Sequence, residues 1–157
     1  MSRSGADLAL LLLAGFRAMA DQGATELAEL GFEDVRPVHD FALHTILSGA
    51  DSASDLGRAM SITKQAAAKT IALLEERGYL TREPDPADKR RMRLRVTERG
   101  LSLLQHGEEV FDRIRLRWEQ QVGASSVAAL EATLRPFVGP NLIQIDAPGW
   151  DARDPEA

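Results

Sequence analysis

Apolar and charged residues alternate strictly along one short segment in the middle of the chain. The apolar positions are Met92, Leu94 and Val96, and the cationic positions are Arg91, Arg93 and Arg95. A period of two is typical of a strand with one buried face and one solvated face. The run 79–83 is the expected partner strand, because the turn formers Pro84, Asp85, Pro86 and Asp88 separate the two runs. The pattern predicts a β-hairpin with a positively charged face and an arginine-rich tip.

The remaining apolar positions recur with helical spacing. The predicted helices cover 7–30, 33–47, a short stretch from 52 or 54 to 60, 63–77, 97–122 and 126–138. The first of these helices is apolar on nearly every side near its start, so it must be buried from several directions. A second copy of the chain would bury the apolar surface of this helix that the rest of the chain cannot bury. The predicted fold class is mainly α, with one small β-hairpin.

The start of the chain resembles an export signal only in part. Arg3 precedes the apolar run 8–16, and the Ala-Met-Ala sequence at 18–20 resembles a cleavage site. However, Asp7 adjoins the run, Arg17 interrupts it, and an amphipathic pattern continues to residue 30. The run is also much shorter than the ~20 residues that span a bilayer. We therefore expect an internal helix, a cytoplasmic location and no membrane partner.

Two consecutive helices in the middle of the chain have the layout of a helix-turn-helix. The short helix ending at residue 60 is predicted to turn Leu56, Ala59 and Met60 inward. Thr63 is a good N-cap for the next helix, and Gly78 is the expected C-terminal glycine. Its inward stripe is Ala67, Ile71 and Leu74, and its outward positions are Lys64, Gln65, Ala68 and Lys69. Small and hydrogen-bonding residues at the start of such a helix suit the DNA major groove.

The charge distribution supports a nucleic-acid partner. The whole chain carries a formal net charge of -5, and it contains no cysteine, which excludes disulfides and thiolate metal sites. Residues 58–99 hold 11 Lys and Arg against 6 Asp and Glu, whereas the rest of the chain holds 8 against 18. A basic module therefore lies within an acidic frame.

The sequence from Ser61 to Gly100, SITKQAAAKTIALLEERGYLTREPDPADKRRMRLRVTERG, resembles the winged helix-turn-helix of the multiple-antibiotic-resistance regulator (MarR) family. The resemblance implies a homodimer in which N- and C-terminal helices intertwine, and it implies binding to a palindromic operator. The implied division of the chain is a dimerisation helix at 1–32, a winged lobe at 33–100 and dimerisation helices at 101–139. The recognition helix would be 63–77 and the wing 79–97. Residues 140–157 are predicted to form an irregular tail.

Carried over residue by residue, the resemblance places Thr63, Lys64, Gln65, Ala68 and Lys69 on the recognition helix. It places Asp88 and Arg90 on the wing, where Arg90 would enter the minor groove. Asp88 would hold or orient Arg90 or a neighbouring arginine through a bidentate pair. Arg82 and Arg91 are further candidates for contact with double-stranded DNA. Ala68 and Lys69 depart from the family, which often has a hydroxyl residue followed by arginine at these positions. For Arg93 and for Arg95, each taken separately, a place on the solvated face of the strand is as good an explanation as contact with DNA.

In the family, a small-molecule effector binds between the dimer helices and the DNA-binding lobe. The candidate walls of such a pocket here are Phe16, His39, Leu43 and Trp118, although each is also a natural core or interface residue. His39 and His44 are about 140° apart around a helix, so they do not share a face. A zinc site at His39 with Asp40, or at His44 with a residue from another helix, is a weaker alternative. We expect neither a resident metal nor a cofactor.

Catalysis has little support, because the chain has no glycine-rich phosphate loop, no cysteine nucleophile and no HExxH spacing. The sequence therefore predicts a ligand-responsive repressor and not an enzyme. The alternatives are an activator or a metal-responsive regulator of the same fold, and a winged helix that binds another protein.

Overall fold

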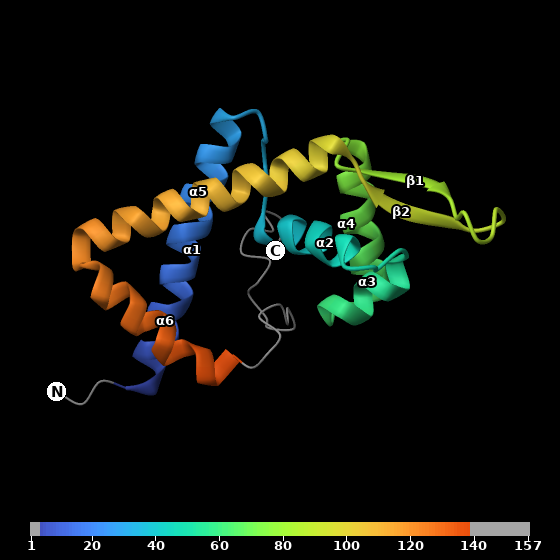
Figure 1. Cartoon of the computed structure of the whole chain (residues 1–157). Helices are drawn as coiled ribbons and strands as arrows, with labels where there is room; N and C mark the ends of the chain where they lie inside the picture. The colour runs from blue at the N-terminus through green and yellow to red at the C-terminus, as the bar shows by residue number, and fades with distance from the viewer. Residues whose placement is uncertain (1–3, 139–157) are drawn as a thin grey trace.

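The computed structural model describes residues 4–138, which form six helices and one antiparallel hairpin (Figure 1). The elements in chain order are α1 (Gly5–Glu29), α2 (Pro37–Leu47), α3 (Ala53–Met60), α4 (Lys64–Glu76), β1 (Leu80–Pro84), β2 (Met92–Val96), α5 (Glu98–Val122) and α6 (Ala124–Val138). The predicted fold class, mainly helical with a two-stranded wing, is confirmed. The predicted tail at 140–157 lies outside the described residues.

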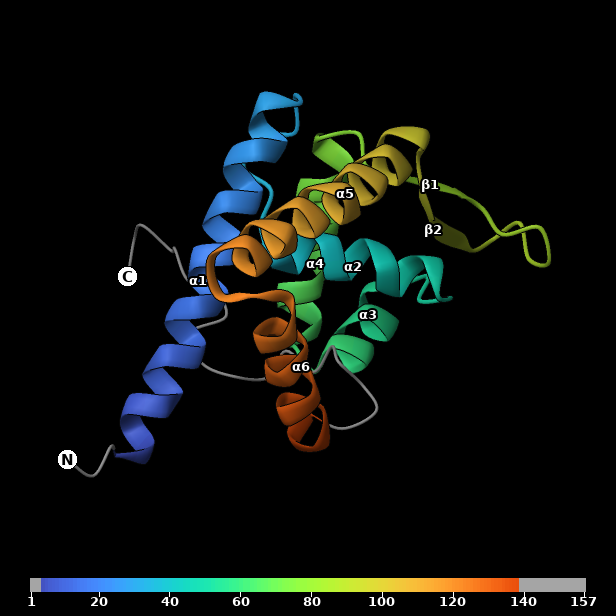
Figure 2. The same cartoon turned by 60° about the vertical axis from the view of Figure 1, so that its left-hand side comes forward.

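The long helix α5 organises the molecule. It runs from the lobe built by α2, α3, α4 and the hairpin to the region where α1 and α6 contact it (Figures 1 and 2). Glu26 on α1 accepts hydrogen bonds from Arg113 and Arg117 on α5, so charged pairs as well as apolar side chains join these two helices. Within residues 4–138, no helix is both long and apolar enough to cross a membrane.

Capping side chains set several helix boundaries. The Ser4 hydroxyl accepts the Asp7 backbone N–H at 3.2 Å and the Asp7 carboxylate accepts the Ser4 N–H, a capping box that starts α1 two residues earlier than predicted. Thr63 caps α4, as predicted, and Thr97 caps α5. The helix predicted over 33–47 begins only at Pro37, because proline at a first helical position favours a start there and Asp34 has a positive φ of 51°.

The core lies between α2, α3, α4, the hairpin and the first half of α5. Its fully buried side chains include Leu43, Leu56, Ile71 and Leu103. One expectation was wrong here: Ala59 of α3 is exposed and Gly57 is buried in its place. A Cβ on Gly57 would lie 3.0 Å from the Ile62 carbonyl oxygen, so the glycine permits the close approach of the turn that leads into α4.

The other end of the molecule leaves much apolar surface uncovered. Exposed large apolar residues occur on the first half of α1, near the end of α5 and on α6. They include Leu8, Leu10, Leu11, Leu12, Leu13, Leu116, Val122, Leu130 and Phe137. Leu11 is 65% exposed and Phe137 is 83% exposed, although both lie on well-formed helices. A surface of this kind is typical of an interface with another chain.

Candidate nucleic-acid interface

The start of α4 presents its polar side chains to solvent. The Thr63 hydroxyl accepts the Ala66 backbone N–H at 3.0 Å, which fixes the first turn, and Lys64 and Gln65 are exposed there. Ala68 and Lys69 are exposed one turn later. The opposite face is anchored by Ala67, Ile71 and Leu74, which are all fully buried, as the apolar pattern predicted. One face of α4 is therefore packed against the core, and the opposite face, called the front of α4 below, exposes small and polar side chains to solvent.

The turn between α3 and α4 is short because of its backbone conformation. Ser61 adopts the left-handed conformation with φ 54°, and the Ile62 N–H donates to the Gly57 carbonyl group at 2.9 Å. This geometry ends α3 and redirects the chain within three residues. The two helices are thereby packed against each other in the layout of a helix-turn-helix.

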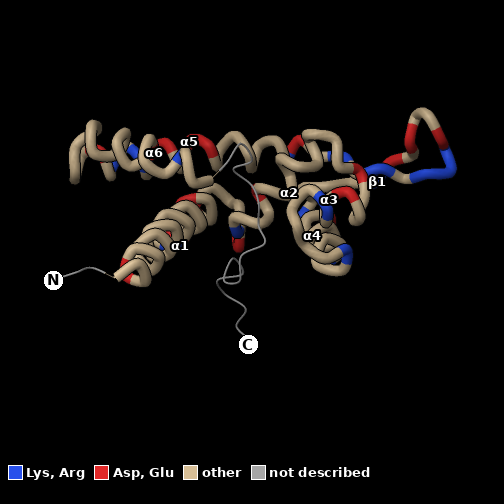
Figure 3. Tube along the Cα trace, turned by 90° about the horizontal axis from the view of Figure 1, so that it is seen from below, with Lys and Arg blue, Asp and Glu red and all other residues tan. Residues whose placement is uncertain are grey.

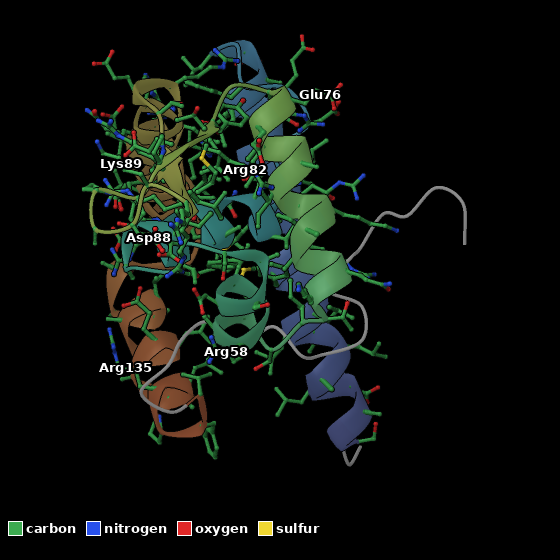
Figure 4. The ribbon with its side chains drawn as sticks, turned by 90° about the vertical axis from the view of Figure 1, so that its right-hand side faces the viewer. Arg58, Glu76, Arg82, Asp88, Lys89 and Arg135 are labelled. Carbon is green, nitrogen blue, oxygen red and sulfur yellow. The ribbon has the colours of Figure 1, made fainter. Side chains whose placement is uncertain are left out.

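Hydrogen bonds close the loop at the tip of the wing. The Asp88 carboxylate accepts the Arg90 backbone N–H at 3.0 Å, and the Arg91 N–H donates to the Asp88 carbonyl group at 2.9 Å. Asp85 caps the same loop by accepting the Ala87 N–H at 2.9 Å. The expected side-chain pair between Asp88 and a guanidinium group is not formed; Asp88 shapes the backbone instead. Figure 4 shows Asp88 and Lys89 on this loop.

The positive charge on the solvated face of the hairpin is partly neutralised, because two arginines share one carboxylate. Glu83 lies opposite Arg93 across the two strands and accepts hydrogen bonds from Arg93 at 2.9 Å and Arg95 at 3.1 Å. These bonds, with that from Arg93 the larger cause, hold the pKa of the Glu83 carboxyl below its usual value. On the other face Leu94 and Val96 are buried, but Met92 is 50% exposed, contrary to the alternation.

Two other predicted DNA contacts also have acidic partners. Arg82 donates to the Glu75 carboxylate of α4 at 2.9 Å. Arg91 lies just before β2, and it donates to the Asp51 carboxylate at 2.5 Å. Both pairs are partly solvated, so a phosphate could exchange with either carboxylate at modest cost. Neither arginine is a free cation in the DNA-free chain.

The 11 Lys and Arg side chains of residues 58–99 fall into three groups by partner. Those paired with carboxylates are Arg58, Arg82, Arg91, Arg93 and Arg95. Those donating to backbone carbonyl groups are Arg77 and Arg99. Those without a hydrogen-bond or ion-pair partner among residues 4–138 are Lys64, Lys69, Lys89 and Arg90. The last group lies on the front of α4 and at the wing tip, and Figure 3 shows that the wing projects beyond the rest of the chain.

The four residues predicted to line an effector pocket are placed differently. Leu43 is fully buried in the core, and His39 is 5% exposed. Phe16 lies half-buried on α1, and Trp118 lies half-buried on α5. A groove of about 460 Å³ does open between α1 and α5, and of the four candidates only Trp118 lines it. Its other walls are Asp21, Gln22, Thr25, Glu26, Arg117 and Gln121.

His39 is a structural residue in this setting. Its Nδ1 accepts the Arg36 backbone N–H at 3.1 Å, which caps the start of α2. Burial, then the charges of Arg77 and Arg36, lower the pKa of His39 to about 4, so the ring is neutral at pH 7. His44 lies 3.6 Å from Asp40. Within residues 4–138, no three His, Cys, Asp or Glu side chains gather as a metal site would require.

Sequence reasoning missed three acidic residues and one basic residue that define this surface. Asp51, Glu75 and Glu83 set which arginines are free, and Lys89 is free beside Arg90. The position of Lys89 within the turn sequence was a usable signal. Asp51 lies 40 residues before Arg91, and nothing in the local pattern indicates their pairing.

Comparison with known proteins agrees with this geometry. Residues 36–91 match the model of the MarR family, and they contain α2, the helix-turn-helix, β1 and the wing tip. Over these residues the chain is similar to the MarR family.

Solved structures show the same fold over most of the chain. Wild-type MarR from E. coli, in its apo form, is 20% identical with a TM-score of 0.64, and the match covers 89% of this chain and 100% of MarR. Transcriptional regulator Tm0710 from Thermotoga maritima is 22% identical with a TM-score of 0.57, covering 84% and 92%. A mutant of S. aureus MepR bound to an oligodeoxyribonucleotide is 17% identical with a TM-score of 0.56, covering 83% and 95%.

Proposed function

We propose that this chain is a MarR-family DNA-binding transcriptional regulator. It binds a palindromic operator as a homodimer, represses transcription from the cytoplasm, and responds to a small molecule. The observation that carries the proposal is the location of the unpaired cations. Lys64 and Lys69 flank the front of α4, and Lys89 and Arg90 occupy the wing tip. A recognition helix and a wing supplied with free positive charge are suited to the major groove and the adjacent minor groove.

Base recognition is assigned to the first turns of α4. Gln65 can pair with the N6 and N7 positions of adenine. Lys64 can meet either a phosphate or the O6 and N7 positions of guanine. Thr63 is committed to the cap, so its hydroxyl contributes mainly by fixing the turn. At the wing, Arg90 suits a narrow minor groove, where negative potential is concentrated.

The homodimer is proposed from the uncovered apolar surface of α1, α5 and α6. Five of the six residues from Leu8 to Leu13 are leucines, at least 38% exposed, and they point in several directions around α1. A second copy would bury them by packing its own helices between these faces. Two lobes related by such a dimer would place two α4 helices in successive major grooves, about 34 Å apart. A dimer spanning two grooves would exclude other proteins from that stretch of a promoter, which is why we propose repression.

The groove between α1 and α5 is the proposed effector site. It combines the flat apolar surface of Trp118 with the charged pair of Glu26 and Arg117. A ligand lodged between these helices would change how α1 crosses α5, and therefore the separation of the two lobes in a dimer. Such a ligand lowers operator affinity by its preference for the lobe separation that does not fit DNA.

The proposal is tested by selecting bound duplexes from random DNA and then titrating salt against the selected operator. We expect a palindromic site. Arg90→Ala is expected to bind more weakly, with a slope of log affinity against log salt that is shallower by about 0.9 if one phosphate contact is lost. Arg95→Ala is the matched control, because Arg95 has the same charge in the same hairpin but is paired with Glu83. Absence of any enriched sequence at low salt would contradict the proposal.

A further inference from the structure

One residue outside the hairpin contacts the wing at two points. Asp51 lies in the connection between α2 and α3. Its carboxylate accepts a hydrogen bond from the Arg91 guanidinium group at 2.5 Å, and its carbonyl oxygen accepts the Leu94 backbone N–H at 3.2 Å. The second bond uses the edge of β2 that does not face β1, so Asp51 extends the sheet by a single bond. Both bonds are made across at least 40 residues of sequence.

The two contacts are separated along the hairpin. Arg91 and Leu94 are three positions apart, which corresponds to about 10 Å of extended chain. Two attachments at that spacing restrain the direction of the hairpin, whereas a single contact would leave it free to pivot. Arg91 also closes the tip loop, because its carbonyl group accepts the Asp85 N–H at 2.8 Å and its own N–H donates to Asp88. Holding Arg91 therefore holds the loop that carries Lys89 and Arg90.

Asp51 is also connected to the recognition helix through rigid structure. It directly precedes Ser52, whose hydroxyl caps α3 by accepting the Asp55 N–H at 3.1 Å. Helix α3 is joined to α4 by the tight turn at Gly57 and Ile62, and the two helices pack against each other. The path from the wing through Asp51 to α4 contains no long loop.

We infer that Asp51 is the positioning residue of the wing, and that Arg91 serves as its tether and not as a DNA ligand. Asp51 sets where Lys89 and Arg90 lie relative to the front of α4. It thereby determines which base pairs beside the major-groove site are sampled by the wing. The competing role for Arg91 is a phosphate contact, in which Asp51 would be displaced by DNA and would only weaken binding.

The two roles of Arg91 predict opposite results for the same variants. We would measure affinity for the selected operator with Asp51→Ala, Arg91→Ala and the double variant, with Arg95→Ala as the control for loss of one wing charge. If Asp51 positions the wing, each single variant binds about threefold to tenfold more weakly and the double variant is no worse than either, because one interaction is lost in all three. The loss concentrates at base pairs flanking the major-groove site, the salt slope stays at the parent value, and Asp51→Glu restores part of the affinity.

The inference is overturned if Asp51→Ala binds the operator as tightly as the parent or more tightly. It is also overturned if Arg91→Ala makes the salt slope shallower by about 0.9, as loss of a phosphate contact would. Additive losses in the double variant count against it in the same way, since independent contacts add.

A second measurement needs no DNA, so it separates this inference from the proposed operator binding on which the first measurement rests. The chain has no cysteine, so Lys89→Cys gives a single attachment point for a nitroxide spin label at the wing tip. Combining it with Asp51→Ala is expected to increase label mobility on the nanosecond timescale, while combining it with Arg95→Ala is not. Equal mobility in both combinations would overturn the inference even if the protein binds its operator as proposed.

Discussion

Gly100, in the first turn of α5, lies directly against the backbone carbonyl group of Tyr79, the residue before β1. A Cβ at this position would overlap the Tyr79 carbonyl oxygen and would come within 2.7 Å of Val96 Cγ1. The contact fixes the start of α5 against both strands of the wing. It is reinforced by the Thr97 hydroxyl, which accepts the Gly100 N–H at 3.1 Å and donates to the Gly78 carbonyl group at 2.5 Å.

Gly100→Ala is therefore expected to destabilise the fold, although alanine is a better helix former. Overpacking against a backbone group that cannot move aside costs about 1–3 kcal/mol, more than the ~1 kcal/mol gain in helix propensity. Urea unfolding at a fixed protein concentration measures the change. Gly107→Ala in the same helix is the control, because its Cβ would meet Asp40 Oδ1 at an ordinary 3.4 Å. Equal stability of both variants would contradict the assigned contact.

His39 is expected to make the protein less stable in mildly acidic solution. Its pKa is about 4 in the fold against 6.5 in the unfolded chain, so the unfolded chain binds the proton more tightly. Stability is therefore full above pH 6.5 and is lost as pH falls toward 4, by about 3 kcal/mol at pH 4. His39→Asn keeps an acceptor for the Arg36 N–H but does not titrate. Its unfolding free energy should change less between pH 7 and pH 4 than that of the parent, and parallel pH profiles would refute the assignment.

Helix positions were predictable from the sequence because each depends on local signals. Thr63 caps its helix, as its residue type predicted, and the stripe of Ala67, Ile71 and Leu74 is buried, as its helical spacing predicted. Met92 shows where a local pattern fails. It has the alternation of a buried residue, but it is the first residue of β2, next to the loop at the hairpin tip, and half of its side chain is exposed.

The sequence indicated where the candidate site lies, but it did not indicate which of its arginines are paired with carboxylates. The sequence indicated a basic wing, and Arg90 at its tip is a free cation as that reading requires. The partners of Arg82 and Arg91 could not be inferred, because Glu75 and Asp51 reach them only through the tertiary fold. The pairing of Glu83 with Arg93 needed the strand register, which the turn residues alone did not define. Counting charges therefore overestimated the cations available to DNA.

Gln65 and Lys64 are expected to affect DNA binding in different ways. Gln65→Ala should relax the preference at one base pair of each half-site, at a cost of about 1–3 kcal/mol against the correct base. If Lys64 binds a phosphate, Lys64→Ala should weaken binding to all sequences alike and make the salt slope shallower by about 0.9. Selection from random DNA followed by affinity measurement at two salt concentrations separates the two effects. If the base preference of Gln65→Ala is unchanged, Gln65 does not contribute to base recognition.

Leu11 tests the dimer most directly, since it is 65% exposed on a helix that otherwise has no reason to be apolar there. Burying a leucine contributes about 1.5–3 kcal/mol, and a charge in its place would be left without solvent in a dimer interface. Leu11→Glu is therefore expected to shift the protein from dimer to monomer in sedimentation at micromolar concentration. Because a monomer engages only one half-site, affinity for the palindrome should fall with it. Leu47→Glu, at the exposed end of α2 in the DNA-binding lobe, should leave the sedimentation unchanged. A parent protein that sediments as a monomer, or a Leu11→Glu variant that remains dimeric, would show that this face of α1 is covered by something other than a second copy.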